Sequence, residues 1–363
     1  MARKNTILTL SPVLTDWSAP CQVDSEKTKK FLKNNYKFLI IYGILLLLFT
    51  VRLDYEVYTP GGLSNLNKRI SVDNPYESKG SLNLTYVNAK KGIIPMILLS
   101  YIIPSWDLVS IDDSRIEDED YIDILARGKI DLKSVNGNAT ITAFKKANMD
   151  YNIVKNDLTV YYVFNEATTN LKVGDIIKKV DDEVVSDLAS FKKLISEKNV
   201  GDTVTFTVIR NNKETIKTGK IYESDGGKLI GIYLTSVLEV TTDKNVVFKY
   251  KNNESGSSGG LMSALEIYNQ LTKSDITKGL TIAGTGTIDM DGNVGEIAGV
   301  KTLSQSKWLI VLSTILLLVI CLTFPLSADN YEEAKQIVNK YNYKIKLIEA
   351  KNFNQVLEDL EKI

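Results

Sequence analysis

The stretch Gly256-Ser257-Ser258-Gly259-Gly260 governs how this chain is interpreted, together with Gly299-Val300-Lys301, whose lysine follows Ser258 by 43 positions. None of the 363 residues is a histidine, which excludes Ser-His-Asp triads, Cys-His pairs and histidine-ligated zinc sites. A serine nucleophile in this chain needs another base, and lysine is the known substitute. Ser258 stands in a turn of small residues before an apolar run, where the start of a helix would supply backbone N–H donors.

These residues resemble the active-site motifs of Lon-type peptidases. Ser257-Ser258-Gly259-Gly260 stands where that family has Pro-Ser-Ala-Gly, and Ile297-Ala298-Gly299-Val300-Lys301 stands where it has Ile-Gly-Gly-Leu-Lys. The separation matches without a gap, and Thr285-Gly286 stands where the family has a Thr-Gly. The resemblance implies Ser258 as nucleophile, Lys301 as base and Thr285 as a supporting residue. The best-matched block covers residues 246–301, and within it residues 265–271 and 282–289 are most similar to the membrane-anchored branch that contains a PDZ domain.

Serine–lysine catalysis requires a neutral lysine, whereas a lysine with its ordinary pKa of about 10.4 is protonated at neutral pH. Burial lowers a lysine pKa, and Lys301 follows apolar residues, although Glu296 is a competing ion-pair partner. Lys301 would accept the Ser258 proton as Oγ attacks a peptide carbonyl, and backbone amides around Ser257 and Ser258 would stabilise the oxyanion. The alternative is a surface loop and an unrelated surface lysine.

The N-terminal region predicts a membrane anchor. Residues 1–37 are polar and lysine-rich at their end, and an apolar run over residues 38–51 follows. That run is shorter than the roughly 20 residues of a spanning helix, so we extend it to residue 54. The lysines favour a cytoplasmic tail over residues 1–37 and an extracytoplasmic remainder. A cleaved signal peptide and a buried core helix are the alternatives.

Residues 151–222 predict a PDZ-like domain. Three features of this stretch, in this order, are similar to bacterial PDZ domains. They are the turn and strand Lys172-Val173-Gly174-Asp175-Ile176-Ile177, apolar residues at helical spacing over 191–195, and an alternating strand from Gly201. Such domains bind an extended peptide by strand addition, so a PDZ peptide ligand is a candidate partner. A glycine-rich carboxylate-binding loop is not evident before Leu158, and a structural PDZ domain without a ligand is the alternative. Peptidase-like sequence on both sides, over 55–150 and 223–363, implies an insertion.

Two apolar stretches leave alternatives open. Residues 308–324 depart from the Lon pattern and are nearly all apolar, so they form either core elements of the peptidase or a second membrane segment. The membrane interpretation would separate residues 331–363 from Lys301 and leave the enzyme inactive. Residues 92–109 are apolar but interrupted by Pro95 and Pro104, and they predict a core segment or a membrane-surface patch rather than a span.

Composition limits the partners and cofactors. Lys plus Arg and Asp plus Glu both total 44, which argues against a nucleic-acid partner. Residues 295–302 miss the phosphate-binding pattern by one inserted valine, so no ATP-driven module is expected. We expect no cofactor and no metal site, because the acidic turn around Gly292 lacks the downstream glutamate of a calcium loop.

The sequence therefore predicts an α+β fold: a Lon-type proteolytic domain with an inserted PDZ domain, preceded by one transmembrane helix. The predicted function is that of an ATP-independent, membrane-anchored, extracytoplasmic serine endopeptidase that cleaves secreted or membrane-tethered peptides and unfolded proteins. The alternative is a catalytically inactive scaffold whose PDZ domain binds peptide or membrane-protein segments.

Overall fold

The structure, a computed structural model, describes residues 25–224, 226–295, 297, 315–319, 330–340 and 346–363. It divides into two compact units, Met1–Val51 and Arg52–Ile363. Helix α1 (Ser25–Thr50) is the described part of the first unit, and none of its residues is buried. Its length and apolar composition suffice to cross a membrane, and a signal sequence would meet the same criteria. At about 1.5 Å per residue, its 26 residues exceed the roughly 30 Å of a bilayer's hydrocarbon core.

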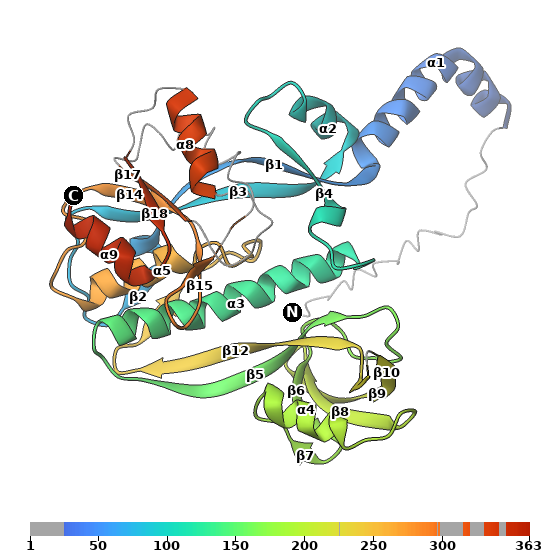
Figure 1. Cartoon of the computed structure of the whole chain (residues 1–363). Coiled ribbons are helices and arrows are strands. Elements are labelled where there is room, and N and C mark those ends of the chain that lie inside the picture. The colour runs from blue at the N-terminus through green and yellow to red at the C-terminus, as the bar shows by residue number, and fades with distance from the viewer. Residues whose placement is uncertain (1–24, 225, 296, 298–314, 320–329, 341–345) are drawn as a thin grey trace, which may run out of the picture. The chain divides into compact units, whose positions relative to one another are not determined.

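A mixed six-stranded sheet forms one layer of the second unit (Figure 1). Its strands, in spatial order, are β18 (Lys346–Ala350), β17 (Ile315–Val319), β14 (Thr281–Gly284), β3 (Ser81–Ile93), β1 (Arg52–Asn65) and β4 (Asp107–Ser110). The strands from β18 to β3 run parallel to one another, whereas β1 is antiparallel to both β3 and β4.

Strand β17 comes from the apolar run at 308–324. It lies between β14 and β18, with Ile282 opposite Ile315 and Lys346 opposite Ile315 on the other side. A strand inside a parallel sheet has a near-continuous apolar sequence, and Ile315–Val319 has that character. The other residues of the run lie outside the described residues.

The main hydrophobic core lies around α5 (Gly260–Leu271), which packs on α3 (Tyr121–Lys146). Every residue of α5 except Tyr268 is buried, including the polar residues Ser263, Glu266, Asn269 and Gln270. α9 (Phe353–Glu361) adds its apolar face to the same core. The core also takes residues from η1 (Leu66–Lys68), β2 (Ile70–Val72), β13 (Val246–Phe248), β15 (Thr287–Ile288) and β16 (Val294–Gly295). Three further elements contact the six-stranded sheet, namely α2 (Ile94–Ser100), η2 (Ile111–Asp113) and α8 (Asn330–Lys340).

A second sheet has a separate core. Its strands, in spatial order, are β12 (Ile232–Thr242), β5 (Tyr151–Val163), β6 (Ile176–Val180), β8 (Thr203–Arg210) and β9 (Lys213–Lys220), with β7 (Glu183–Val184) paired to β6. α4 (Leu188–Ser196) contributes Phe191, Leu194 and Ile195 to this core. A capping box starts α4, since Asp187 accepts a hydrogen bond from the Ser190 backbone N–H at 2.7 Å. The hairpin of β10 (Tyr222–Ser224) and β11 (Gly227–Leu229) follows β9.

The residues of the second core lie, in sequence, between two groups of residues that form the main core. Residues of the second core fall between 158 and 234, whereas the main core takes residues from both before and after that range. The second sheet also extends past residue 222, because β12 pairs along its whole length with β5, from Ile232 opposite Val163 to Thr242 opposite Tyr151. This long pairing places β12 with the PDZ-like segment rather than with the sequence that follows it.

Candidate active site

Ser258 lies in the turn that leads into α5. Gly256 in this turn has φ +91°, a left-handed conformation that glycine adopts without strain. Gly259 is the N-cap of the helix, so Ser258 immediately precedes the cap and is half-buried. Among the described residues, neither the Ser258 hydroxyl nor the backbone N–H groups of Ser257 and Ser258 have a hydrogen-bond partner. These donors, at the positive end of a helix, are suited to stabilising an anion.

Thr285 and Gly286 are brought directly against Ser258. The Thr285 hydroxyl donates to the Ser258 carbonyl oxygen at 3.0 Å, and the Gly286 N–H donates to the same oxygen at 2.6 Å. In return, the Leu261 N–H donates to the Gly286 carbonyl at 2.9 Å. β14 ends at Gly284, so the carboxyl end of a parallel strand delivers the fully buried Thr285 to the start of α5. Lys301 lies outside the described residues.

Helix α3 holds the loop before Ser258 from the other side. The Gly128 carbonyl accepts a hydrogen bond from the Gly256 N–H at 2.7 Å. A Cβ atom on Gly128 would lie 3.2 Å from the Ser255 Cβ, so the absent side chain permits this close approach. The Lys129 ammonium donates to the Asn252 carbonyl at 2.5 Å and also to the Glu254 carbonyl. α3 thus fixes the course of the loop that carries Ser258.

A buried carboxyl group lies two turns along α5. Glu266 is 2% exposed, and burial raises its pKa from 4.5 to about 7, although a hydrogen bond from Gln270 opposes this rise. Gln270 Nε2 donates to Glu266 Oε1 at 2.6 Å and to the Ile70 carbonyl at 3.0 Å, while its Oε1 accepts from the Val72 N–H. Sequence reasoning missed Glu266; the available signal was an acidic residue flanked directly by the apolar residues Leu265 and Ile267.

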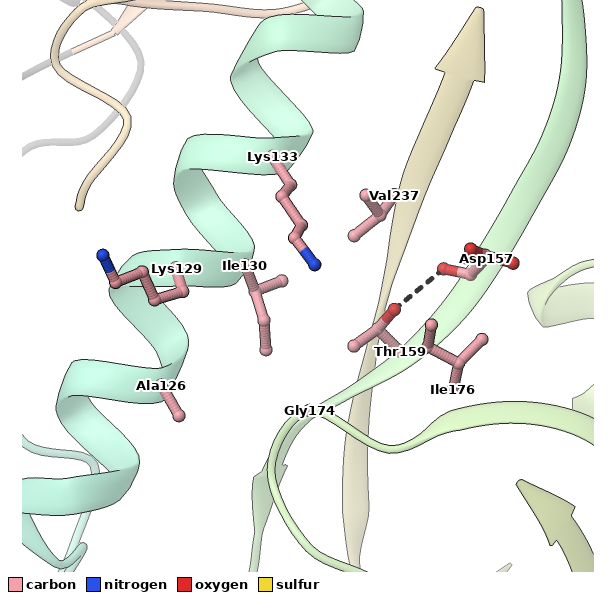
Figure 2. Close-up of a pocket in the computed structure, with 9 residues that line it drawn as sticks. All are labelled: Ala126, Lys129, Ile130, Lys133, Asp157, Thr159, Gly174, Ile176 and Val237. Atoms are coloured by element: carbon pink, nitrogen blue, oxygen red, sulfur yellow. Dashed lines mark hydrogen bonds between the residues drawn. The ribbon is translucent and has the colours of Figure 1, made fainter. Parts of the chain in front are cut away.

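A pocket of about 270 Å³ lies between α3 and the second sheet (Figure 2). Figure 2 shows Lys133 extending into it, whereas Lys129 points away. Asp157 at its far side is paired with Lys178 at 2.5 Å. The lining residues are Ala126, Lys129, Ile130, Lys133, Asp157, Thr159, Gly174, Ile176 and Val237.

Across the described residues, no group of three or more Cys, Asp or Glu side chains is arranged to hold a metal ion.

Comparison with known proteins identifies a PDZ domain in this chain. The family model of the PDZ domain matches residues 145–218. A curated relative, the serine protease Do-like HtrA of Lactobacillus helveticus, is 39% identical over 64 residues of the PDZ region. This match covers 17% of the chain and 16% of the relative, so the chain spans only about a sixth of that protein.

Solved PDZ domains of SdrC-like proteins are also similar to part of this chain. The domain from Listeria monocytogenes is 25% identical, covers 23% of this chain and 92% of its own, and has a TM-score of 0.21. The domain from Listeria innocua is 27% identical, covers 22% of this chain and 92% of its own, and has a TM-score of 0.21. PDZ domains bind peptide ligands, commonly by adding the peptide as a strand to a sheet edge.

Proposed function

We propose that this protein is a membrane-anchored, ATP-independent serine endopeptidase of the Lon-like type, which uses Ser258 as nucleophile and Lys301 as base. The observation that carries the proposal is the pair of hydrogen bonds from Thr285 and Gly286 to the Ser258 carbonyl. Residues 27 positions apart, singled out by the same family resemblance, meet at the start of a buried helix. An unrelated surface loop has no reason to be held in this way.

The proposed reaction is acyl transfer. Ser258 Oγ attacks the peptide carbonyl while Lys301 accepts the hydroxyl proton and later gives a proton to the leaving amine. The N–H groups of Ser257 and Ser258, with no partner among the described residues, donate to the developing oxyanion. Water then attacks the acyl-enzyme, with Lys301 again accepting a proton, and regenerates Ser258. Thr285 acts by holding the backbone of Ser258 rather than by touching the substrate.

The PDZ domain would recruit the substrate. β12 lies at the edge of its sheet and has no paired strand on one side among the described elements; α3 packs against it at Leu238, so the part of β12 away from that contact is the proposed peptide site. An extended peptide can add to such an edge through backbone hydrogen bonds, which accept many sequences. Peptides and unfolded proteins, secreted or membrane-tethered, are therefore the proposed substrates. α1 would hold the enzyme in the membrane, with its lysine-rich N-terminal side cytoplasmic and residues from Arg52 onward outside.

The test is cleavage of casein, without ATP, by the detergent-purified full-length protein. Ser258→Ala and Lys301→Ala should each lower the rate by about a thousandfold or more, because nucleophile and base act as one unit. Ser255→Ala and Lys249→Ala, at exposed positions, are the matched controls and should keep full activity. Activity that survives Lys301→Ala would exclude the serine–lysine mechanism. An inactive wild-type protein that still binds peptides would favour the scaffold, for which the PDZ match provides the support.

A further inference from the structure

An uncharged segment, residues 92–106, connects β3 to β4 through helix α2. Pro95 lies in the first turn of α2, where a missing N–H costs no hydrogen bond, so the helix forms despite the proline. Large apolar side chains of this segment face solvent: Leu98 is 59% exposed, Tyr101 78% and Ile102 73%. Neighbouring large apolar residues on one surface commonly mark an interaction site. We name residues 93–106 the α2 patch.

The α2 patch is fixed to the place where the chain leaves its apolar N-terminal helix. Arg52 is the first residue after the unit that contains α1, and the register of β1 and β3 pairs Arg52 directly with Ile93. Ile93 is the residue before α2. α2 also packs on β1, β3 and β4, as Figure 1 shows. Paired Cα atoms lie about 5 Å apart, so the chain position that ends the proposed membrane span is a direct neighbour of the α2 patch.

We propose that the α2 patch inserts into the outer surface of the phospholipid bilayer in which α1 is anchored. This inference rests on the membrane anchoring proposed above. An apolar segment with aromatic residues and no charge is suited to the region between headgroups and acyl chains, about 5–10 Å deep. Tyr101 is well exposed, Trp106 is half-buried, and the exposed cations Arg52 and Lys90 lie at the same end of β1 and β3. These cations would meet anionic headgroups.

Insertion would give the peptidase a second attachment besides α1. A single helix leaves the domain that follows it free to pivot about one connection, whereas two neighbouring attachments restrict that motion. Gly284 pairs with Leu84, nine residues before Ile93, so Thr285 and Ser258 would be held at a set distance of about 30 Å from the α2 patch. This position favours substrates that are themselves tethered to the membrane.

The experiment places an environment-sensitive fluorophore on the full-length protein in phosphatidylcholine–phosphatidylglycerol vesicles. The label is attached at Ile102→Cys, in a chain with Cys21 and Cys321 replaced by serine. Nitroxide lipids, with the quencher near the headgroup or deep in the acyl chains, report contact. The matched control is Ile216→Cys, since Ile216 is 69% exposed on β9 of the PDZ domain. Leu45→Cys in α1 reports the anchor itself.

The label at position 102 should lose most of its emission to the shallow quencher, and the label at 216 should lose little. Equal, weak quenching at 102 and 216, with deep quenching at 45, would overturn the α2 patch as a lipid site and leave the anchor intact. Absence of quenching at 45 would overturn the anchor and this inference together. A shielded label at 102 that lipids do not quench, and that becomes exposed on dilution, would assign the patch to a second protein copy. Casein cleavage is measured on the same samples, so failure of the peptidase proposal is scored separately.

Discussion

Replacing Glu266 with glutamine should stabilise the protein at alkaline pH. The side chain is 2% exposed inside the main core, and burial raises its pKa from 4.5 to about 7. Glu266→Gln keeps the size of the side chain and an oxygen that can accept the hydrogen bond from Gln270. It removes the ionisable group without opening a cavity, so the change isolates the cost of a buried charge.

The direction in which stability changes with pH follows from the pKa values of Glu266 in the folded and unfolded states. The folded state holds the Glu266 proton more tightly than the unfolded state, so the unfolded chain loses it first as pH rises above about 4.5. The free energy of unfolding therefore falls between about pH 4.5 and 7 and then stays level. The two pKa values differ by about 2.5, which at about 1.4 kcal/mol per pKa unit gives a cost of roughly 3–4 kcal/mol at pH 8. Glu266→Gln recovers up to this amount.

The assay is urea unfolding of the detergent-solubilised protein at pH 4 and pH 8, followed by tryptophan fluorescence. The variant should be more stable than the wild type by up to roughly 3–4 kcal/mol at pH 8 and nearly equal at pH 4. Glu358→Gln, at an exposed position of α9, is the control and should change neither value by more than about 0.5 kcal/mol. A gain of the same size at both pH values, or none at pH 8, would refute the argument from burial.

Three further substitutions test the site and the PDZ domain. Thr285→Val should lower casein cleavage about tenfold to a hundredfold by releasing the Ser258 backbone, while Thr285→Ser keeps the hydroxyl and most of the activity. Gly128→Ala should lower activity by displacing the Ser258 loop, with the melting temperature unchanged or higher, since alanine favours the helix by about 1 kcal/mol. Arg210→Met leaves the buried Asp175 carboxylate without its two 2.6 Å contacts and should destabilise the PDZ domain by about 3–5 kcal/mol, measured by calorimetry.

Local patterns made the PDZ domain predictable from sequence. Gly174 and Gly201 occupy turns with φ of +91° and +93°, and the strand that begins at Thr203 alternates buried and less buried residues as its sequence does. The membership of β12 in the second sheet was not predictable, because it depends on pairing with β5, about 80 residues away. Such pairing depends on loop closure and on complementary faces, and neither leaves a signal in a short window of sequence.

In the candidate active site, too, some residues could be predicted from the sequence and others could not. Ser258 and Thr285 were identified together by family resemblance, and their hydrogen bond is a contact that periodicity could not have indicated. Gly128 carried no signal, because a glycine inside a helix has meaning only once the loop that crosses it is known. Glu266 was missed for a related reason: acidic residues are seldom fully buried, and their burial follows from tertiary packing on all sides of α5.

Helix α3 contacts both the second sheet and the loop before Ser258, the proposed nucleophile. On one side, α3 supplies the Gly128 carbonyl and the Lys129 ammonium to the loop before Ser258. On another, Asp131 accepts a hydrogen bond from the β5 residue Tyr161 at 3.1 Å. A Cβ atom on Gly137 would lie 2.8 Å from a β12 carbonyl, so α3 approaches the PDZ sheet as closely as backbone atoms allow. If the second sheet binds a peptide, the packed contacts that connect β12 and β5 to the Ser258 loop run through α3 rather than through a flexible linker.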